Sequence, residues 1–152
     1  MNKIISVTTK LNCDSLRAFE MFTMNELLES WLTVRADVEP KIGGKYELFW
    51  NPEDKMNDST IGCKITGLEP DKFLSFGWKG PRKFRRIMNE CDPLTHVVVF
   101  FLPFKGKSGE PITEVHLIHS GWGNTPEWEG ARFWFEKAWR DSFKNLKKLS
   151  DK

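Results

Sequence analysis

Hydrophobic and polar residues alternate along most of the chain in short segments that are typical of β-strands. Residues 3–11, KIISVTTKL, are rich in β-branched side chains with a loose two-residue alternation and predict the first strand. Turn signals such as the glycine pair 43–44 and the polar loop 51–58 separate the later segments. These later strands are expected at 34–40, 45–50, 59–68, 73–79, 95–104 and 112–120.

Two short helices are expected between the first and second strands. Asp14 or Ser15 is suited to cap a helix that runs through about residue 22, where apolar residues recur at helical spacing. Thr23 and Glu26 then form a capping-box pattern, which predicts that a second helix begins there and continues through NELLESWL.

The C-terminal segment has the pattern of one long amphipathic helix. Thr125 can cap it, Pro126 fits its first turn, and charged residues occupy the far side. Small residues alternate with large aromatic ones, so the helix either approaches the sheet closely or leaves an unfilled volume beneath it. The apolar stripe comprises Trp128, Ala131, Phe135, Ala138, Trp139, Ser142, Leu146 and Leu149.

Together these elements predict an α+β fold, in which a curved antiparallel sheet grips the long C-terminal helix as a single domain over residues 1–152. Five motifs occur in order: SWLT, GGKYEL, FLSFGW, HSGWG and AWRDSFKNLKKL. In these motifs the chain resembles the START-like (SRPBCC) helix-grip superfamily, and within it the branch named for homology to the activator of the heat-shock protein 90 ATPase. The resemblance implies a cavity between the sheet and the final helix.

Composition and charge narrow the range of functions. Hydrophobic residues make up 39% and charged residues 29% of the chain, without an apolar run long enough for a membrane span. Because no secretory signal pattern is visible at the N-terminus, we expect a cytoplasmic protein. Cys13, Cys63 and Cys91 lack metal-site spacing and are expected to be reduced thiols. The net charge of +2 gives no support for nucleic acid as a partner.

The residues show no arrangement that predicts catalysis. His116 and His119 are three apart in an expected strand, so they point to opposite faces and cannot share a metal ion. Ser120 and Cys91 lack an identifiable base, and no phosphate-binding loop is present. We therefore assign no catalytic residue, metal or cofactor. His119 could pin the following turn by a hydrogen bond or act in proton transfer.

The stretch 79–93 is longer and more basic than expected between two strands of this fold. Its cationic residues surround Phe84 and superficially resemble a nucleic-acid patch, but a solvated loop is favoured. An anionic head group at a cavity mouth is a third interpretation. The cluster consists of Lys79, Arg82, Lys83, Arg85 and Arg86.

The aromatic residues favour a non-catalytic binder of a small hydrophobic or amphipathic molecule, since ligand pockets are mostly apolar. The first alternative is a cyclase-like or dehydratase-like enzyme with His119, or a carboxylate such as Glu47, as general acid or base. The second is a protein-interaction or co-chaperone-like domain, or a homodimer, formed through exposed aromatics such as Trp122, Phe133 and Trp134. The expected ligand-binding residues are Trp31, Trp50, Trp78, His119, Trp122, Phe135, Ala138, Trp139 and Ser142.

Overall fold

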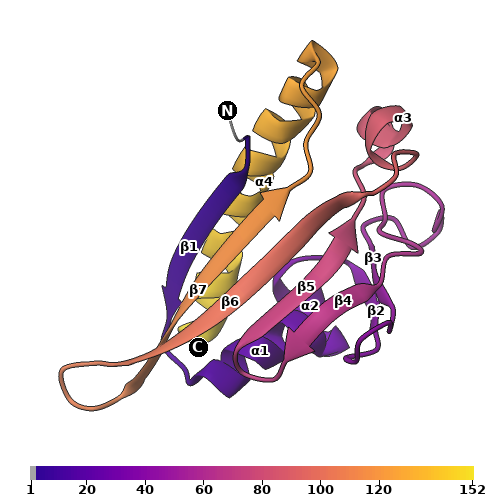
Figure 1. The fold of residues 1–152 in the computed structure, drawn as a ribbon. Helices are drawn as coiled ribbons and strands as arrows, with labels where there is room; N and C mark the ends of the chain where they lie inside the picture. Colours follow the sequence, from indigo (N-terminus) through magenta and orange to yellow (C-terminus); the bar gives the residue numbers. More distant parts are fainter. Residues whose placement is uncertain (1–2) are drawn as a thin grey trace.

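A five-stranded antiparallel sheet with one long helix across its inner face forms the frame of the molecule (Figure 1). The computed structural model describes residues 3–152, and the strand order in the sheet is β1-β7-β6-β5-β4. The predicted α+β architecture is confirmed. The elements are β1 (Ile5–Leu11), α1 (Ser15–Thr23), α2 (Asn25–Trp31), β2 (Arg35–Val38), β3 (Tyr46–Phe49), β4 (Ile65–Glu69), β5 (Phe73–Trp78), the 3₁₀ helix η1 (Arg82–Phe84), α3 (Arg85–Met88), β6 (Thr95–Lys105), β7 (Pro111–Ser120) and α4 (Pro126–Ser150).

The long hairpin of β6 and β7 sets which side chains enter the core. Val97 pairs with His119 and Val99 pairs with Leu117, and all four side chains are fully buried. Because side chains alternate between the two faces of a strand, odd-numbered residues face α4 and even-numbered residues face outward. The alternation seen in the sequence therefore follows the division between core and outer face.

The six expected strands of the meander do not form one continuous ladder. β2 and β3 make a separate two-stranded sheet, and isolated bridges of Lys45 with Lys64 and of Phe49 with Ser59 join it to the segment before β4. The strand expected at 59–68 begins only at Ile65, because the Thr60 hydroxyl accepts from the Leu48 N–H and donates to the Tyr46 carbonyl. These side-chain bonds hold the preceding residues in turns beside β3.

The two short helices are present, but the predicted cap of the second is wrong. Asp14 caps α1 by accepting from the Arg17 N–H at 2.8 Å, as expected for a helix N-cap. Thr23, however, is the last residue of α1, and its hydroxyl donates to the Phe19 carbonyl one turn back. α2 begins at Asn25 without a side-chain cap. The hydroxyl that should have started the second helix thus stabilises the end of the first.

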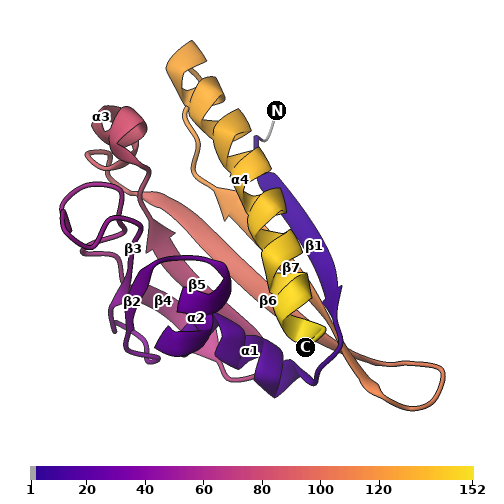
Figure 2. The same cartoon turned by 180° about the vertical axis from the view of Figure 1, so that it is seen from behind.

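α4 crosses the inner face of the sheet, and α1 and α2 cover the same face beside its C-terminal half (Figure 2). Thr125 caps α4 and Pro126 occupies its first turn, as predicted. The buried face is rotated from the predicted stripe, because Phe143 and Ser150 are buried whereas Ala138 and Ser142 are only partly covered. The residues with the deepest burial are Ala131, Phe135, Trp139, Phe143, Leu146 and Ser150.

Candidate functional site

A pocket of about 290 Å³ lies between the middle of α4, the end of β5 and the loop after β3. Its apolar walls come from tryptophans of three different elements together with Phe135 and Ala138 of α4. Asn51, Asp58 and Ser59 of the loop after β3 supply polar groups. An apolar chamber with a few polar groups is the usual composition of a small-molecule site.

The tryptophan wall is built by packing between separate elements. Trp78 ends β5 on the inner face, and its ring centroid lies 5.0 Å from that of Trp139 on α4 and 5.9 Å from that of Trp50. The Trp50 indole N–H donates to the Leu32 carbonyl at 3.0 Å, which fixes this ring at the end of α2. The wall is therefore held by both packing and a hydrogen bond.

The pocket exists because α4 presents small side chains there. Ala138 and Ser142 lie one turn apart on the helix and both line the pocket. Neither side chain reaches across to the Trp50 and Trp78 rings, so the space between helix and sheet stays unfilled. The alternation of small and large residues allowed either a close approach of the helix to the sheet or an unfilled volume beneath it. At these positions the volume is unfilled.

One polar atom in the tryptophan wall lacks a partner. The indole Nε1 of Trp78 is buried and makes no hydrogen bond within residues 3–152. A buried donor without an acceptor costs about 1–3 kcal/mol, so most such groups in folded proteins are paired. This N–H belongs to a side chain that lines the pocket.

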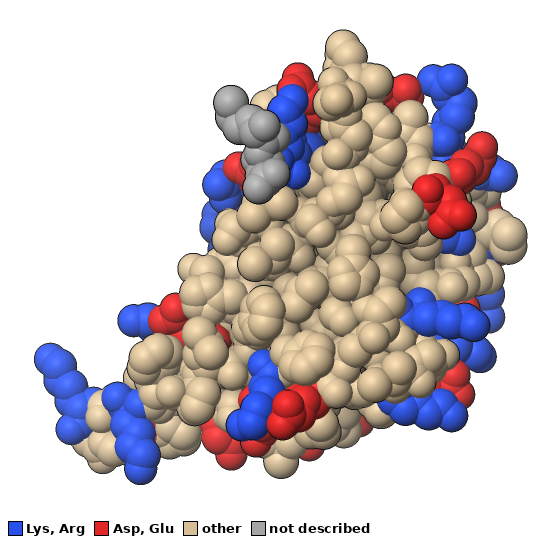
Figure 3. All heavy atoms as spheres, in the orientation of Figure 1, with Lys and Arg blue, Asp and Glu red and all other residues tan. Residues whose placement is uncertain are grey.

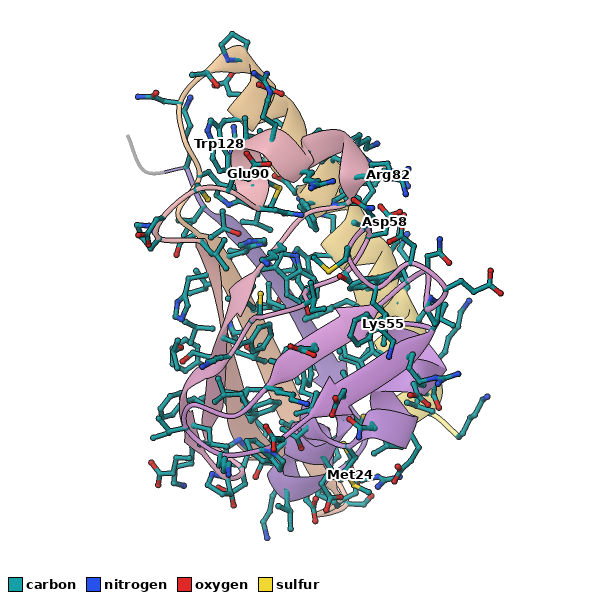
Figure 4. All side chains as sticks on the ribbon, turned by 90° about the vertical axis from the view of Figure 1, so that its right-hand side faces the viewer. Met24, Lys55, Asp58, Arg82, Glu90 and Trp128 are labelled. Atoms are coloured by element: carbon teal, nitrogen blue, oxygen red, sulfur yellow. The ribbon has the colours of Figure 1, made fainter. Side chains whose placement is uncertain are left out.

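Hydrogen bonds tie the loop at the pocket rim to the segment after β5. Asp58 accepts from the backbone N–H of Arg82 at 2.7 Å, and the Arg82 guanidinium donates to Asp54 at 2.9 Å (Figure 4). Asp58 has a positive φ of 52°, a conformation that Asp tolerates better than most residues. The rim is thus two segments, far apart in sequence, clamped to each other.

The basic stretch 79–93, for which a solvated loop was favoured, contains η1 and α3, and its cations are mostly exposed but have defined partners. Arg86 pairs with Glu127 at the start of α4, and Arg85 bonds Asn57. Lys83 lies over the Trp134 ring at 4.7 Å, and Phe84 packs against the same ring. These contacts dock the stretch onto α4 and the rim loop, a role that its charge alone did not indicate.

Six of the nine expected ligand-binding residues line this one pocket, and three do not. Trp31 is in the core, where its indole N–H donates to the Met21 carbonyl. Trp122 packs on Trp128, and its indole N–H donates to the His119 carbonyl. His119 is fully buried and does not line the pocket. The six that line the pocket are Trp50, Trp78, Phe135, Ala138, Trp139 and Ser142.

His119 has both ring nitrogens occupied by neighbours in the core. The Trp139 indole N–H donates to Nδ1 at 3.1 Å, and an indole cannot accept, so the imidazole proton must lie on Nε2. Nε2 lies 3.0 Å from the Thr95 hydroxyl, to which it donates. Burial lowers the pKa of His119 to about 3, with a smaller contribution from His96. This imidazole is neutral and has no free nitrogen for proton transfer.

The remaining lining residues were not among the expected ligand-binding residues: Leu32, Asn51, Asp58, Ser59, Lys79, Gly80, Pro81 and Trp134. Trp134 lies off the predicted apolar stripe of the helix, and its ring packs against Phe84, which is distant in sequence. Gly123 in the HSGWG motif is explained by contact too, since a Cβ there would lie 2.4 Å from the Trp128 ring. A signal for these residues exists only in three dimensions.

Residues 3–152 contain neither a cluster of metal-ligating side chains nor a helix that could span a membrane. In this part of the chain, no three His, Cys, Asp or Glu side chains gather where they could hold a metal ion. None of the helices described is both long enough and apolar enough to cross a bilayer. Cys13, Cys63 and Cys91 are unpaired, and burial raises the pKa of the Cys63 thiol to about 12.

Several solved structures share the fold over nearly the whole chain. A protein from Mesorhizobium loti is 21% identical with a TM-score of 0.70, covering 98% of this chain and 97% of its own. An HSP90 activator from Plasmodium falciparum is 19% identical with a TM-score of 0.71, covering 96% and 94%. The Aha1 dimer from Colwellia psychrerythraea is 17% identical with a TM-score of 0.67, covering 95% and 93%.

Sequence comparison gives the family directly. No curated protein is significantly similar to the chain. The sequence profile of the family described as "Activator of Hsp90 ATPase homolog 1-like protein" matches residues 13–151, which is almost the whole chain and includes all five motifs. The chain belongs to the family of activator of Hsp90 ATPase homolog 1-like proteins.

Proposed function

We propose that the chain binds a small apolar or amphipathic molecule in the pocket between α4 and the end of β5. The observation that carries the proposal is a volume of about 290 Å³ walled by Trp50, Trp78, Trp134 and Trp139 and left open by Ala138. This volume is near the lower end of the range for small-molecule sites. A ligand of two or three aromatic rings suits it.

The indole of Trp78 adds a preference for ligand chemistry. Its N–H is unpaired but has almost no surface open to the pocket, so a ligand oxygen would accept a hydrogen bond from it only after a small rotation of the indole. Asn51, Ser59 and Ser142 can bind a polar end of the same molecule. We therefore favour an aromatic ketone, phenol or similar molecule over a pure hydrocarbon.

Binding of N-phenyl-1-naphthylamine, a neutral apolar fluorophore, tests the proposal. We expect its emission to rise, and tryptophan emission to fall, with micromolar affinity. Ala138→Phe fills the pocket and should weaken binding by at least about tenfold, which corresponds to about 1.4 kcal/mol. Asn145→Phe adds the same ring on the exposed side of α4 and is the matched control.

Two results would contradict the proposal. The first is that neither this probe nor any of a panel of aromatic ketones binds to the folded protein. The second is that Ala138→Phe and Asn145→Phe bind the probe equally well, because the probe would then occupy another site. Circular dichroism of each variant establishes that the fold is intact, and Ser142→Leu serves as a second filling variant.

Protein binding is the second candidate function, and one observation favours it. Phe133 and Trp134 of α4 are 60% and 38% exposed, and the Arg132 guanidinium lies over the Phe133 ring. Aromatic and arginine side chains are enriched in protein interfaces. Because a structural neighbour is an HSP90 activator, the test is whether the chain raises the ATPase rate of Hsp90 and whether Phe133→Ser removes the effect.

A further inference from the structure

A groove of about 630 Å³ lies between β1 and the C-terminal half of α4, and it shares no residue with the tryptophan-walled pocket. Figure 2 shows the helix and the strand running alongside each other, with β1 at the edge of the sheet. Val7 of β1 and Phe143 of α4 are buried and form the apolar floor of the groove. One wall is therefore strand and the other is helix.

The strand wall is the backbone edge of β1. Residues 6–9 line the groove as a consecutive run, although alternate side chains of a strand point to opposite faces. What these four residues have in common is the edge of the strand. Within residues 3–152, β1 pairs with β7 and with no strand on its other side. An edge strand presents unpaired N–H and C=O groups on its free side, so this wall can pair with a further strand.

Nothing in the sequence of residues 6–9 blocks this edge. Proteins commonly protect edge strands with charged side chains, prolines or β-bulges. The run SVTT contains no charge and no proline, and the register of β1 with β7 is continuous from Ile5 to Leu11. The edge therefore lacks the usual protection against pairing.

The helix wall is positively charged. Four cationic residues of α4 line the groove, and no acidic residue does. Two of the cations have exposed partners one turn away, Glu136 and Asp151, and such surface ion pairs are weak. The other two make no ion pair within residues 3–152. The four cationic residues, which we call the cation row, are Arg140, Lys144, Lys147 and Lys148.

The spacing of the cation row matches that of a strand. Arg140, Lys144 and Lys148 follow one another at intervals of four residues, which is a rise of about 6 Å per step along the helix. Alternate side chains on one face of a strand are about 6.8 Å apart. A strand added to β1 would therefore place every second side chain beside the next cation of the row, on the face of the sheet that α4 covers.

We propose that an extended segment of a partner protein, with Asp or Glu at alternate positions, adds to the edge of β1 and pairs its carboxylates with the cation row. Phosphates of lipid or nucleic acid would also pair with the cations, but only a peptide has the N–H and C=O groups that match the edge. The outer face of the sheet offers no comparable row, because its charged side chains are of both signs and lie mainly around the margins (Figure 3).

Fluorescence anisotropy of a fluorescein-labelled peptide of four Thr-Glu repeats tests the proposal. We expect saturable binding at about 0.1 M salt, where charges are screened over about 10 Å, and weaker binding as salt is added. Lys144→Glu and Lys148→Glu should each weaken binding by about fivefold or more, because each replaces an attraction with a repulsion. Lys137→Glu makes the same change of charge on α4 outside the groove and is the matched control.

A second peptide separates edge pairing from charge attraction. It has the same side chains but carries a methyl group on every backbone nitrogen, so it keeps the four carboxylates and has no N–H to donate. We expect it to bind at least about fivefold more weakly than the Thr-Glu peptide, because strand addition depends on main-chain hydrogen bonds. Circular dichroism of each variant establishes that the fold is intact.

Four outcomes would overturn the proposal. One is that the Thr-Glu peptide shows no saturable binding to the folded protein. Another is that the methylated peptide binds equally well, which would mean that charge alone acts. A third is that Lys144→Glu and Lys148→Glu bind the peptide as well as Lys137→Glu does, which would place the site elsewhere. The last is that phosphatidylserine vesicles or an oligonucleotide bind through Lys144 while the peptide does not, which would make the cation row a phosphate-binding surface.

Discussion

The two ends of the space between α4 and the sheet use aromatic residues for different purposes. At the closed end, Phe22 of α1 and Trp31 of α2 pack with Phe143 of α4, with ring centroids 5.0 to 6.3 Å apart. At the open end, the loop after β3 and the segment after β5 line the gap, and Trp50, Trp78 and Trp139 face a cavity. Aromatic residues thus form a filled core where α1 and α2 cover them. They form the wall of a pocket where loops cover them.

The difference comes from what faces the rings. The closed end receives two helices whose apolar side chains interdigitate with those of α4, as packed cores require. The open end receives Ala138 and Ser142, which are too short to fill the same depth. The cavity in this chain therefore follows from two small residues on α4 and from loops, in place of α1 and α2, on the opposite side, and it need not weaken the rest of the core.

The largest expected effect sharpens this contrast. Phe143→Ala should cost about 3–5 kcal/mol of unfolding free energy, because its ring is enclosed by Phe22, Trp31 and Trp139. Phe135→Ala should fall at the lower end of this range, about 3 kcal/mol, because its ring is equally buried but borders the pocket. Urea unfolding of both variants measures the difference. Equal losses would mean that the two ends are equally packed.

His119 provides the next largest effect, and it depends on pH. Its folded-state pKa of about 3 lies below the unfolded value of 6.5, so its contribution is complete above pH 6.5 and is lost as pH falls toward 3. Between pH 7 and pH 5 the protein should lose about 2 kcal/mol through this group.

His119→Asn should be less stable at neutral pH but lose less on acidification. His116→Asn is the control. It removes a partly exposed imidazole that pairs with Glu114 and leaves the buried imidazole of His119 in place. Thermal melts at several pH values distinguish them. If His119→Asn and the parent chain lose equal stability between pH 7 and pH 5, the imidazole is not held neutral by burial.

The smallest expected effect concerns the rim of the open end. Asp58→Gly removes the acceptor of the Arg82 N–H while permitting the positive φ, and should cost about 1 kcal/mol or less at this partly exposed site. Amide hydrogen exchange over 51–58 should accelerate. Asp58→Asn retains an acceptor oxygen and should exchange at the parent rate, and equal acceleration in both variants would contradict a clamp by this bond.

The sequence predicted correctly those elements that depend on local residue patterns. The alternation of β6 and β7, the cap at Asp14 and the start of α4 at Pro126 follow from local patterns, and the structure has them. Thr23 was misread because a hydroxyl near a helix boundary can bond backward or forward, and only the length of α1 decides.

The pocket was harder to predict because it depends on tertiary packing. Ala138 and Ser142 were expected at the site from the family resemblance and from their small size on the helix stripe, and both line it. The helix phase itself was slightly wrong, since Phe143 is buried where α1 and α2 pack on α4. Trp134 joins the wall only because the distant Phe84 docks beside it, and no local pattern records that contact.

The chain of rings from Trp50 through Trp78 to Trp139 has an optical consequence. Their centroids are 5.9 and 5.0 Å apart with interplanar angles of 76° and 44°, close enough for the excited states of the three indoles to mix. Such coupling produces paired positive and negative bands in the circular dichroism of tryptophan. The wall of the pocket therefore carries an intrinsic spectroscopic signature that shows whether the three rings keep their arrangement, with or without any added molecule.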